Sequence, residues 1–152
     1  NDNIFSLFIS RISVGTHTFR HQVGSNNFVQ SGKPIGPILG SDCIEDKVGI
    51  NILVRKDLLA YFNIGLIRVG QNNILDNPYD PYIDYLDGPF PSGKITSTFF
   101  VGKNIQYNYK NSFFYSFGVR YEKRYIEPKN FQNDSLINFY LNFSIHFKKK
   151  ES

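Results

Sequence analysis

The sequence is poor in the residues that build helices and cross-links. It has no Met and no Trp, one Cys, and a single Ala at position 60. Ala is the best helix former, whereas the aromatic and β-branched residues that are frequent here favour strands. Phe and Tyr contribute 15 and 10 residues, which makes the aromatic fraction 16%. The composition therefore predicts an all-β protein.

The missing Met and the lone Cys bear on processing and on chemistry. Because the sequence lacks even an initiator Met, we expect it to be a processed or excised piece whose N-terminal part is absent. Cys43 cannot form an internal disulfide, and its surroundings have no spacing typical of a metal site. We therefore predict neither a metal nor a cofactor.

Long apolar runs and a one-sided charge pattern are also absent. No stretch reaches the roughly 18 apolar residues of a transmembrane helix, and we expect no signal peptide within these residues. The net charge is +4, but the basic residues are scattered, and 148–150 is their only run. A nucleic-acid-binding protein gathers its Lys and Arg on one face. We therefore expect no nucleic-acid partner.

The last third of the chain alternates between apolar and polar residues. Odd positions are mostly apolar in 95–109, 113–125 and 135–147, while the even positions are rich in Asn, Ser, Thr and Gly. A period of two predicts strands. Strands in soluble domains have about 5–6 residues, whereas a tilted membrane-crossing strand needs about 9–11. The length favours membrane strands, and a soluble sandwich or jelly roll remains the alternative.

Further strands are predicted upstream, and the connections between strands fall into two kinds. Candidate strands cover 46–55 and 58–69, with weaker ones at 4–12 and 16–23, which makes seven in total. Tight turns at 55–58 and 110–111 alternate with long connections at 24–45, 70–94 and 126–134. Short periplasmic turns and long external loops are typical of outer-membrane barrels.

We therefore predict a single antiparallel up-and-down transmembrane β-barrel segment over residues 1–152, located in the bacterial outer membrane. The C-terminus would lie on the periplasmic side. Seven is an odd number, whereas bacterial single-chain barrels have even strand numbers. Either the count is off by one or further strands precede Asn1. We expect the second, so that the chain is the C-terminal part of a larger barrel.

The connection 70–94 combines acids, tyrosines and prolines. Aromatic rings pack on sugar C–H faces while carboxylates accept hydroxyl hydrogen bonds, so this composition suits carbohydrate. A calcium site and a plain acidic surface loop remain open as alternatives. The predicted polysaccharide contacts are Tyr79, Asp80, Tyr82, Asp84, Tyr85 and Asp87, together with Lys33.

Two other groups could carry chemistry. His21 lies near Ser25, a pair that a small outer-membrane lipid A deacylase would need within hydrogen-bond reach. No third member of such a site is evident. Arg120, Glu122 and Arg124 share the polar face of one predicted strand, where we expect them to line or brace a lumen.

The segment 30–42 reads QSGKPIGPILGSD, and its glycines suit positive φ or close backbone approach. This run resembles a loop of the capsule-assembly family of outer-membrane barrels, the Wzi-type proteins, and the resemblance covers about residues 16–70. It implies a large barrel that organises capsular polysaccharide. The residues that it implies form an external loop element are Gly32, Lys33, Gly36, Gly40 and Asp42.

The function predicted from the sequence is that of a non-enzymatic outer-membrane barrel involved in the assembly or attachment of capsular polysaccharide. Its partners would be outer-membrane lipid, surface polysaccharide and other envelope proteins. The alternatives are a barrel subunit of a larger envelope or secretion complex, and the lipid A deacylase.

Overall fold

A computed structural model describes residues 4–82, 88–109, 113–126 and 134–145. The long strands are β1 (Ile4–Val14), β4 (Cys43–Arg55), β5 (Leu58–Val69), β6 (Thr96–Tyr109), β7 (Phe113–Ile126) and β8 (Asp134–Ile145). A single-turn 3-10 helix, η1 (Gly24–Asn26), and the two-residue strands β2 (Val29–Gln30) and β3 (Lys33–Pro34) lie between β1 and β4. No helix in these residues is long and apolar enough to cross a membrane.

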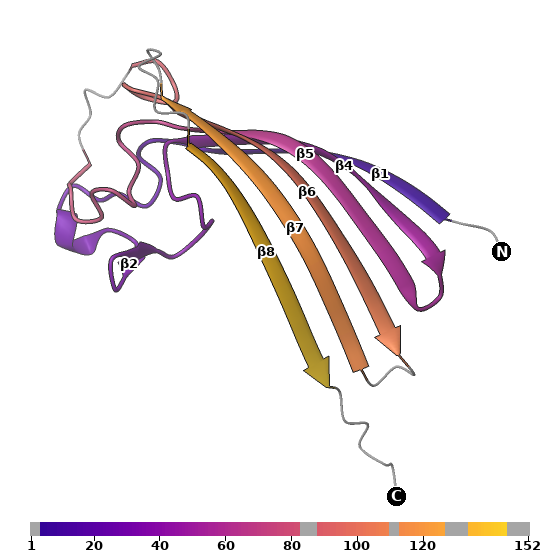
Figure 1. The fold of residues 1–152 in the computed structure, drawn as a ribbon. Coiled ribbons are helices and arrows are strands. Elements are labelled where there is room, and N and C mark those ends of the chain that lie inside the picture. The colour runs from indigo at the N-terminus through magenta and orange to yellow at the C-terminus, as the bar shows by residue number, and fades with distance from the viewer. Residues whose placement is uncertain (1–3, 83–87, 110–112, 127–133, 146–152) are drawn as a thin grey trace, which may run out of the picture.

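The six long strands form one curved antiparallel sheet in the order β1-β4-β5-β6-β7-β8 (Figure 1). Each strand pairs with the next long strand along the chain, which confirms the all-β, up-and-down prediction. Within the described residues β1 and β8 are the two edges and do not pair with each other, so the sheet is open. The described parts of the β1–β4 and β5–β6 connections lie at the same end of the sheet, as Figure 1 shows.

One predicted strand is wrong. Residues 16–23 form turns, in which Thr18 N donates to Gly15 O at 3.1 Å and Arg20 N donates to His17 O at 3.0 Å. Phe19 has φ 74, a left-handed conformation that a strand cannot contain. The main sheet of the described residues therefore has six strands rather than seven.

The predicted connections need corresponding corrections. The first long connection runs over 15–42 rather than 24–45, because 16–23 belongs to it and β4 begins at Cys43. The second separates β5 from β6, close to the predicted 70–94. Of the predicted connection 126–134, residues 127–133 lie outside the described part of the chain.

The register gives the sheet one apolar face, as the alternation predicted. Three successive rows of cross-strand partners hold eighteen positions, and Lys103 is the only charged residue among them. The rows are Phe5, Ile52, Ala60, Ile105, Phe117 and Leu141; Leu7, Ile50, Phe62, Lys103, Val119 and Phe139; and Ile9, Val48, Ile64, Val101, Tyr121 and Ile137. We call these rows the apolar band.

The side chains of the apolar band remain open to the surroundings. Leu7 at one edge is 72% exposed, Phe139 at the other edge is 71% exposed, and Phe62 in the middle of the sheet is still 46% exposed. The band therefore does not form the core of the described residues. An apolar surface that spans six strands is far larger than the scattered apolar residues of ordinary soluble surfaces.

The opposite face, which we call the polar face, is built around glycines. Gly49, Gly65 and Gly118 lie directly opposite Phe8, Phe100 and Tyr140 in the register. A Cβ added at each of these glycines would come within 2.5 Å of the facing ring. The rings cover the bare backbone of the glycines, an arrangement that lets a sheet curve without a void.

We predict that Gly65→Ala destabilises the fold. The added Cβ would lie 2.5 Å from the backbone oxygen of Asp46, which cannot move without disturbing the β4–β5 pairing. We expect the free energy of unfolding to fall by about 2 kcal/mol, as for other overpacked sites. Urea unfolding in detergent micelles measures this change. Gly88→Ala is the matched control, because among the described residues no atom beyond its chain neighbours lies within 4 Å of its added Cβ.

Candidate functional site: a capped cavity over the polar face

The two long connections pack against each other at one end of the sheet. We call residues 15–42, 70–82 and 88–95 the cap. Arg20 joins them: its guanidinium donates to the carbonyl oxygens of Asn72 and Asn77, each at 3.1 Å, and of Asp80 at 3.0 Å. Burial lowers the pKa of Arg20, and the charges of Asp80 and Asp42 oppose that effect.

Asn27 makes a second set of contacts between the two connections. Its Nδ2 donates to Pro78 O at 3.0 Å and to Asp80 O at 2.7 Å, while its Oδ1 accepts from His21 N at 2.6 Å. Because Asn27 is buried, these bonds replace the water that its amide would otherwise hold. The first connection therefore holds the backbone of the second at residues 78–80.

Asp42 lies at the base of the cap and is fully buried. Its Oδ1 accepts from Thr16 Oγ1 and Ser92 N, each at 2.9 Å, and its Oδ2 accepts from Asn72 N at 3.1 Å and Ser92 Oγ at 2.5 Å. The four donors belong to three separate segments of the cap. A single carboxylate thus accepts hydrogen bonds from all three segments. It holds them together next to the start of β4, which follows Asp42 directly.

The glycine-rich run before Asp42 is shaped as its composition predicted. Gly32 and Gly40 have positive φ angles of 74 and 76. Gly36 faces the ring of Phe19, and a Cβ added there would lie 2.4 Å from it. Lys33 is exposed on β3, at the small hairpin that precedes these contacts. The run therefore folds into the cap, with Asp42 as its buried end.

A half-open cavity of about 590 Å³ lies where the cap meets the polar face of the sheet. Ile38, Leu39 and Asp76 contribute its cap side. The sheet side comes from all four central strands, and its lining residues are Glu45, Ile67, Val69, Thr96, Thr98, Arg120, Glu122 and Arg124. Its size is within the range of small-molecule sites, and its walls mix apolar, hydroxyl and charged groups.

The charged groups of the cavity are held in place by their neighbours. Arg120 Nε pairs with Glu122 Oε1 at 2.7 Å on the same strand, and its guanidinium lies 4.0 Å above the ring of Phe100 on β6. Lys47 Nζ pairs with Glu45 Oε1 at 2.8 Å. Arg120, Glu122 and Arg124 were predicted to line or brace a lumen, and they line this cavity.

The acidic tyrosine connection is only partly covered by the described residues. Tyr79 is 61% exposed on the cap surface, and Asp80 beside it is also exposed. The ring of Tyr82 packs edge-on against His17, with 4.2 Å between the ring centroids. Asp84, Tyr85 and Asp87 lie outside the described residues. Lys33 belongs to the first long connection, whereas Tyr79, Asp80 and Tyr82 belong to the second.

The His21 and Ser25 pair gains no support as a hydrolase site. His21 Nδ1 accepts a hydrogen bond from Val23 N at 3.0 Å, so in the neutral ring the proton resides on Nε2. A ring in that state has no free nitrogen to accept a proton from a serine hydroxyl. Among the described residues no cluster of three or more His, Cys, Asp or Glu is placed to hold a metal ion.

The fold and site together define an open antiparallel meander with one apolar face, one polar face and a cap over the polar face at one end. Comparisons of the chain with protein-family models, curated proteins and solved structures give no match.

Proposed function

We propose that this chain is part of an outer-membrane β-barrel that binds capsular polysaccharide at the bacterial cell surface. The observation that carries the proposal is the division of the six-stranded sheet into an exposed apolar face and a capped polar face. In an outer-membrane barrel the apolar face contacts lipid and the polar face lines the lumen.

The borders of the apolar band support a membrane setting. Tyr107 and Tyr115 stack on the tight-turn side, with ring centroids 6.5 Å apart, and Tyr125 lies on the cap side. Tyr is enriched where a membrane meets water. On β7 the apolar face runs from Tyr115 at the tight-turn side to Lys123, the first charged residue toward the cap. This stretch is about 27 Å long, which corresponds to about 20 Å across a membrane at the usual barrel tilt. The span is near the height of the apolar belt of outer-membrane barrels.

The open edges fit the same proposal. In lipid, each unsatisfied backbone group costs several kcal/mol, so an edge strand inside a membrane must be paired. The barrel that we propose therefore includes further strands next to β1 and β8. Those strands belong either to a longer polypeptide or to other copies of the chain.

The cap and the cavity supply the features that suit polysaccharide. The exposed ring of Tyr79 next to Asp80 offers a stacking surface beside a hydrogen-bond acceptor. Separately, the cavity offers carboxylates, guanidinium groups and threonine hydroxyls to a ligand rich in hydroxyls. The resemblance of residues 30–42 to Wzi-type proteins is the reason for choosing capsular polysaccharide among surface glycans.

We predict that Tyr79→Ala weakens glycan binding by about fivefold, because it removes an aromatic stacking contact worth roughly 1 kcal/mol. The measurement is a glycan array probed with the full chain in neutral detergent, followed by titration of the best glycan. Tyr125→Ala is the matched control, since Tyr125 is also exposed but lies on the apolar face.

Two results would contradict the polysaccharide part of the proposal. The first is a folded chain that binds no glycan, which would favour a subunit of a larger envelope complex. The second is equal loss of binding in Tyr79→Ala and Tyr125→Ala, which would place the contact elsewhere than on the cap.

A further inference from the structure

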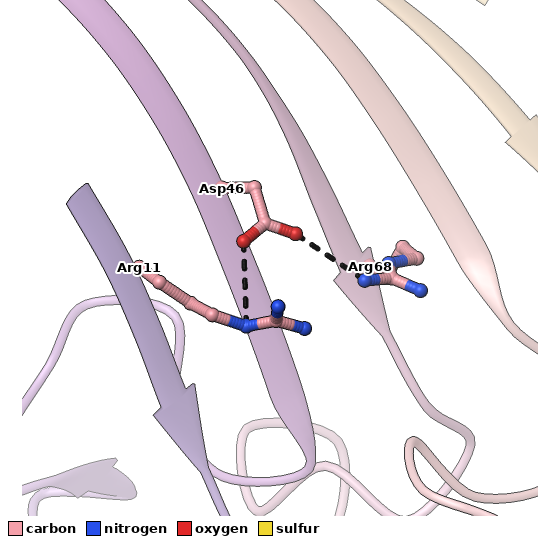
Figure 2. A network of polar contacts seen from close by, with 3 residues as sticks. All are labelled: Arg11, Asp46 and Arg68. Carbon is pink, nitrogen blue, oxygen red and sulfur yellow. Dashed lines mark hydrogen bonds and ion pairs between the residues drawn. The ribbon is translucent and has the colours of Figure 1, made fainter. Parts of the chain in front are cut away.

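Two arginines share one carboxylate at the cap-side border of the apolar band. Arg11 Nε lies 3.4 Å from Asp46 Oδ1, and Arg68 Nη2 lies 3.3 Å from Asp46 Oδ2 (Figure 2). The three side chains come from β1, β4 and β5, and the register puts all of them on the apolar face. Their side chains remain accessible, with exposed fractions of 63% for Arg11, 40% for Asp46 and 34% for Arg68.

The cluster has one more positive charge than it can neutralise itself. Both oxygens of Asp46 are engaged, each by a different arginine. Each guanidinium has five N–H donors, so most donors of the pair are not used by Asp46. Arg68 Nε is buried and has no hydrogen-bond partner among the described residues. Asp46 therefore orients two guanidinium groups that could both donate to one further anion.

A groove of about 530 Å³ begins at this cluster and extends over the apolar face. Arg11 and Asp46 line its polar end, Arg68 lies beside that end through its contact with Asp46, and most of the remaining lining is apolar. The other lining residues are Ile9, Ser10, Lys47, Val48, Ile64, Gly65, Leu66 and Phe99. A ligand that fills the groove and reaches the cluster must have an apolar tail and an anionic head. Phosphate fits the head, because its oxygens match the donor geometry of guanidinium groups.

We propose that Arg11, Asp46, Arg68 and the adjoining groove form a binding site for a phosphorylated lipid. The phosphate accepts hydrogen bonds from the two arginines, and one acyl chain lies in the groove. This inference rests on the proposed membrane function, since the apolar band must be in lipid for such a ligand to reach it. The cluster then stands where the apolar band ends, at the level where a lipid head meets water.

The test separates the head of the ligand from its tail. The full chain in maltoside micelles is titrated by calorimetry with dioctanoyl phosphatidate, with dioctanoylglycerol, which lacks the phosphate, and with glycerol 3-phosphate, which lacks the chains. We expect phosphatidate to bind about 100-fold more tightly than either partial ligand, through two charge-assisted contacts and groove burial. The double variant Arg11→Gln and Arg68→Gln should lose this preference over dioctanoylglycerol.

Two further variants keep the interpretation specific. Arg55→Gln is the matched control, because Arg55 is also exposed and paired with an Asp, at 3.3 Å from Asp57, but lies at the tight-turn end. It should bind phosphatidate as the unmodified chain does. Val48→Trp fills the groove without changing its charge and should weaken phosphatidate binding by about tenfold.

Three results would overturn the inference. Equal binding of phosphatidate and dioctanoylglycerol would exclude a role for the arginines. Glycerol 3-phosphate binding as tightly as phosphatidate would indicate a site for free phosphate. If Arg55→Gln weakened phosphatidate binding as much as the Arg11→Gln and Arg68→Gln double variant does, the overall positive charge of the chain would explain the binding. Flotation with phosphatidylcholine vesicles tests the membrane function separately: if the chain floats but does not discriminate, only the lipid site fails.

Discussion

Replacing Asp42 by Asn should open the cap while leaving the sheet folded. Each oxygen of Asp42 accepts from one backbone N–H: Oδ1 from Ser92 and Oδ2 from Asn72. Whichever way the Asn amide is turned, its NH₂ group points at one of these two backbone N–H groups. An N–H group cannot accept a hydrogen bond, so two donors face each other there. We expect the cap to lose about 3 kcal/mol of stability, the cost of unsatisfied buried donors and a lost charge.

Hydrogen exchange measures this effect directly. The amide protons of Asn72 and Ser92 should exchange about 100-fold faster in Asp42→Asn, while those of β5 and β6 keep their protection. Asn also accepts the positive φ of 53 at this position, so the change isolates the hydrogen bonds from backbone strain. Asp76→Asn is the control: its exposed side chain lines the cavity, but the Asn72 and Ser92 amides donate to Asp42, so neither rate should change. Unchanged exchange at Asn72 and Ser92 would contradict the role assigned to Asp42.

Replacing Lys103 by Leu should stabilise the protein, which is the reverse of what most substitutions do. Lys103 lies in the middle row of the apolar band, opposite Phe62 on β5 and Val119 on β7. A Lys near the middle of a membrane costs about 2–4 kcal/mol on the lipid face of a barrel. Because the long side chain can reach toward the headgroups, we expect Lys103→Leu to gain about 2 kcal/mol.

The measurement is the free energy of unfolding in lipid vesicles, compared with Lys56→Leu at the tight turn between β4 and β5. Lys56 is exposed and lies outside the apolar band, so its replacement should have little effect. If the apolar band were in water, Lys103→Leu would add an exposed apolar side chain and bring no such gain. A loss of stability in Lys103→Leu would therefore count against a lipid-facing band.

Much of the sheet could be predicted from the sequence because one physical rule governs it. Side chains of a strand point alternately to the two faces of the sheet. When one face is apolar and the other polar, apolar and polar residues therefore alternate along the sequence. That rule located β6, β7 and β8 and their apolar positions. The rule was less informative for β5, because its residues are apolar on both faces. The pairing of β5 with β4 and β6 shows which of its residues belong to the apolar band.

The cap could not be predicted in the same way. Arg20 donates to carbonyls that lie 52 to 60 residues away along the chain, and no local pattern signals such contacts. The residues 16–23 alternate weakly, which suggested a strand, but Phe19 turns the chain and Arg20 is drawn to the second connection. The segment that contains Asp42 was singled out, yet its role as a buried hydrogen-bond acceptor depends on residues from both connections.

The cavity also depends on folding that the strand pattern does not contain. The charged face of β7 was predicted from alternation, whereas Ile38, Leu39 and Asp76 reach the cavity only because the cap folds over the sheet. Glu45 likewise gains its place in the cavity from the cap above it. The sequence therefore predicted the three charged residues that β7 contributes to the cavity, but neither the other sheet residues nor those of the cap.

The central claim is that the apolar band faces lipid while the opposite face is wet. Nitroxide labels at Asn104, Ile105 and Gln106, three consecutive positions of β6, test it in vesicles, with Cys43→Ser as background. The account predicts that the label at Ile105 collides with oxygen dissolved in lipid and is protected from an aqueous nickel chelate. Labels at Asn104 and Gln106 should show the opposite preference. Equal access of the nickel chelate to all three positions would contradict the account.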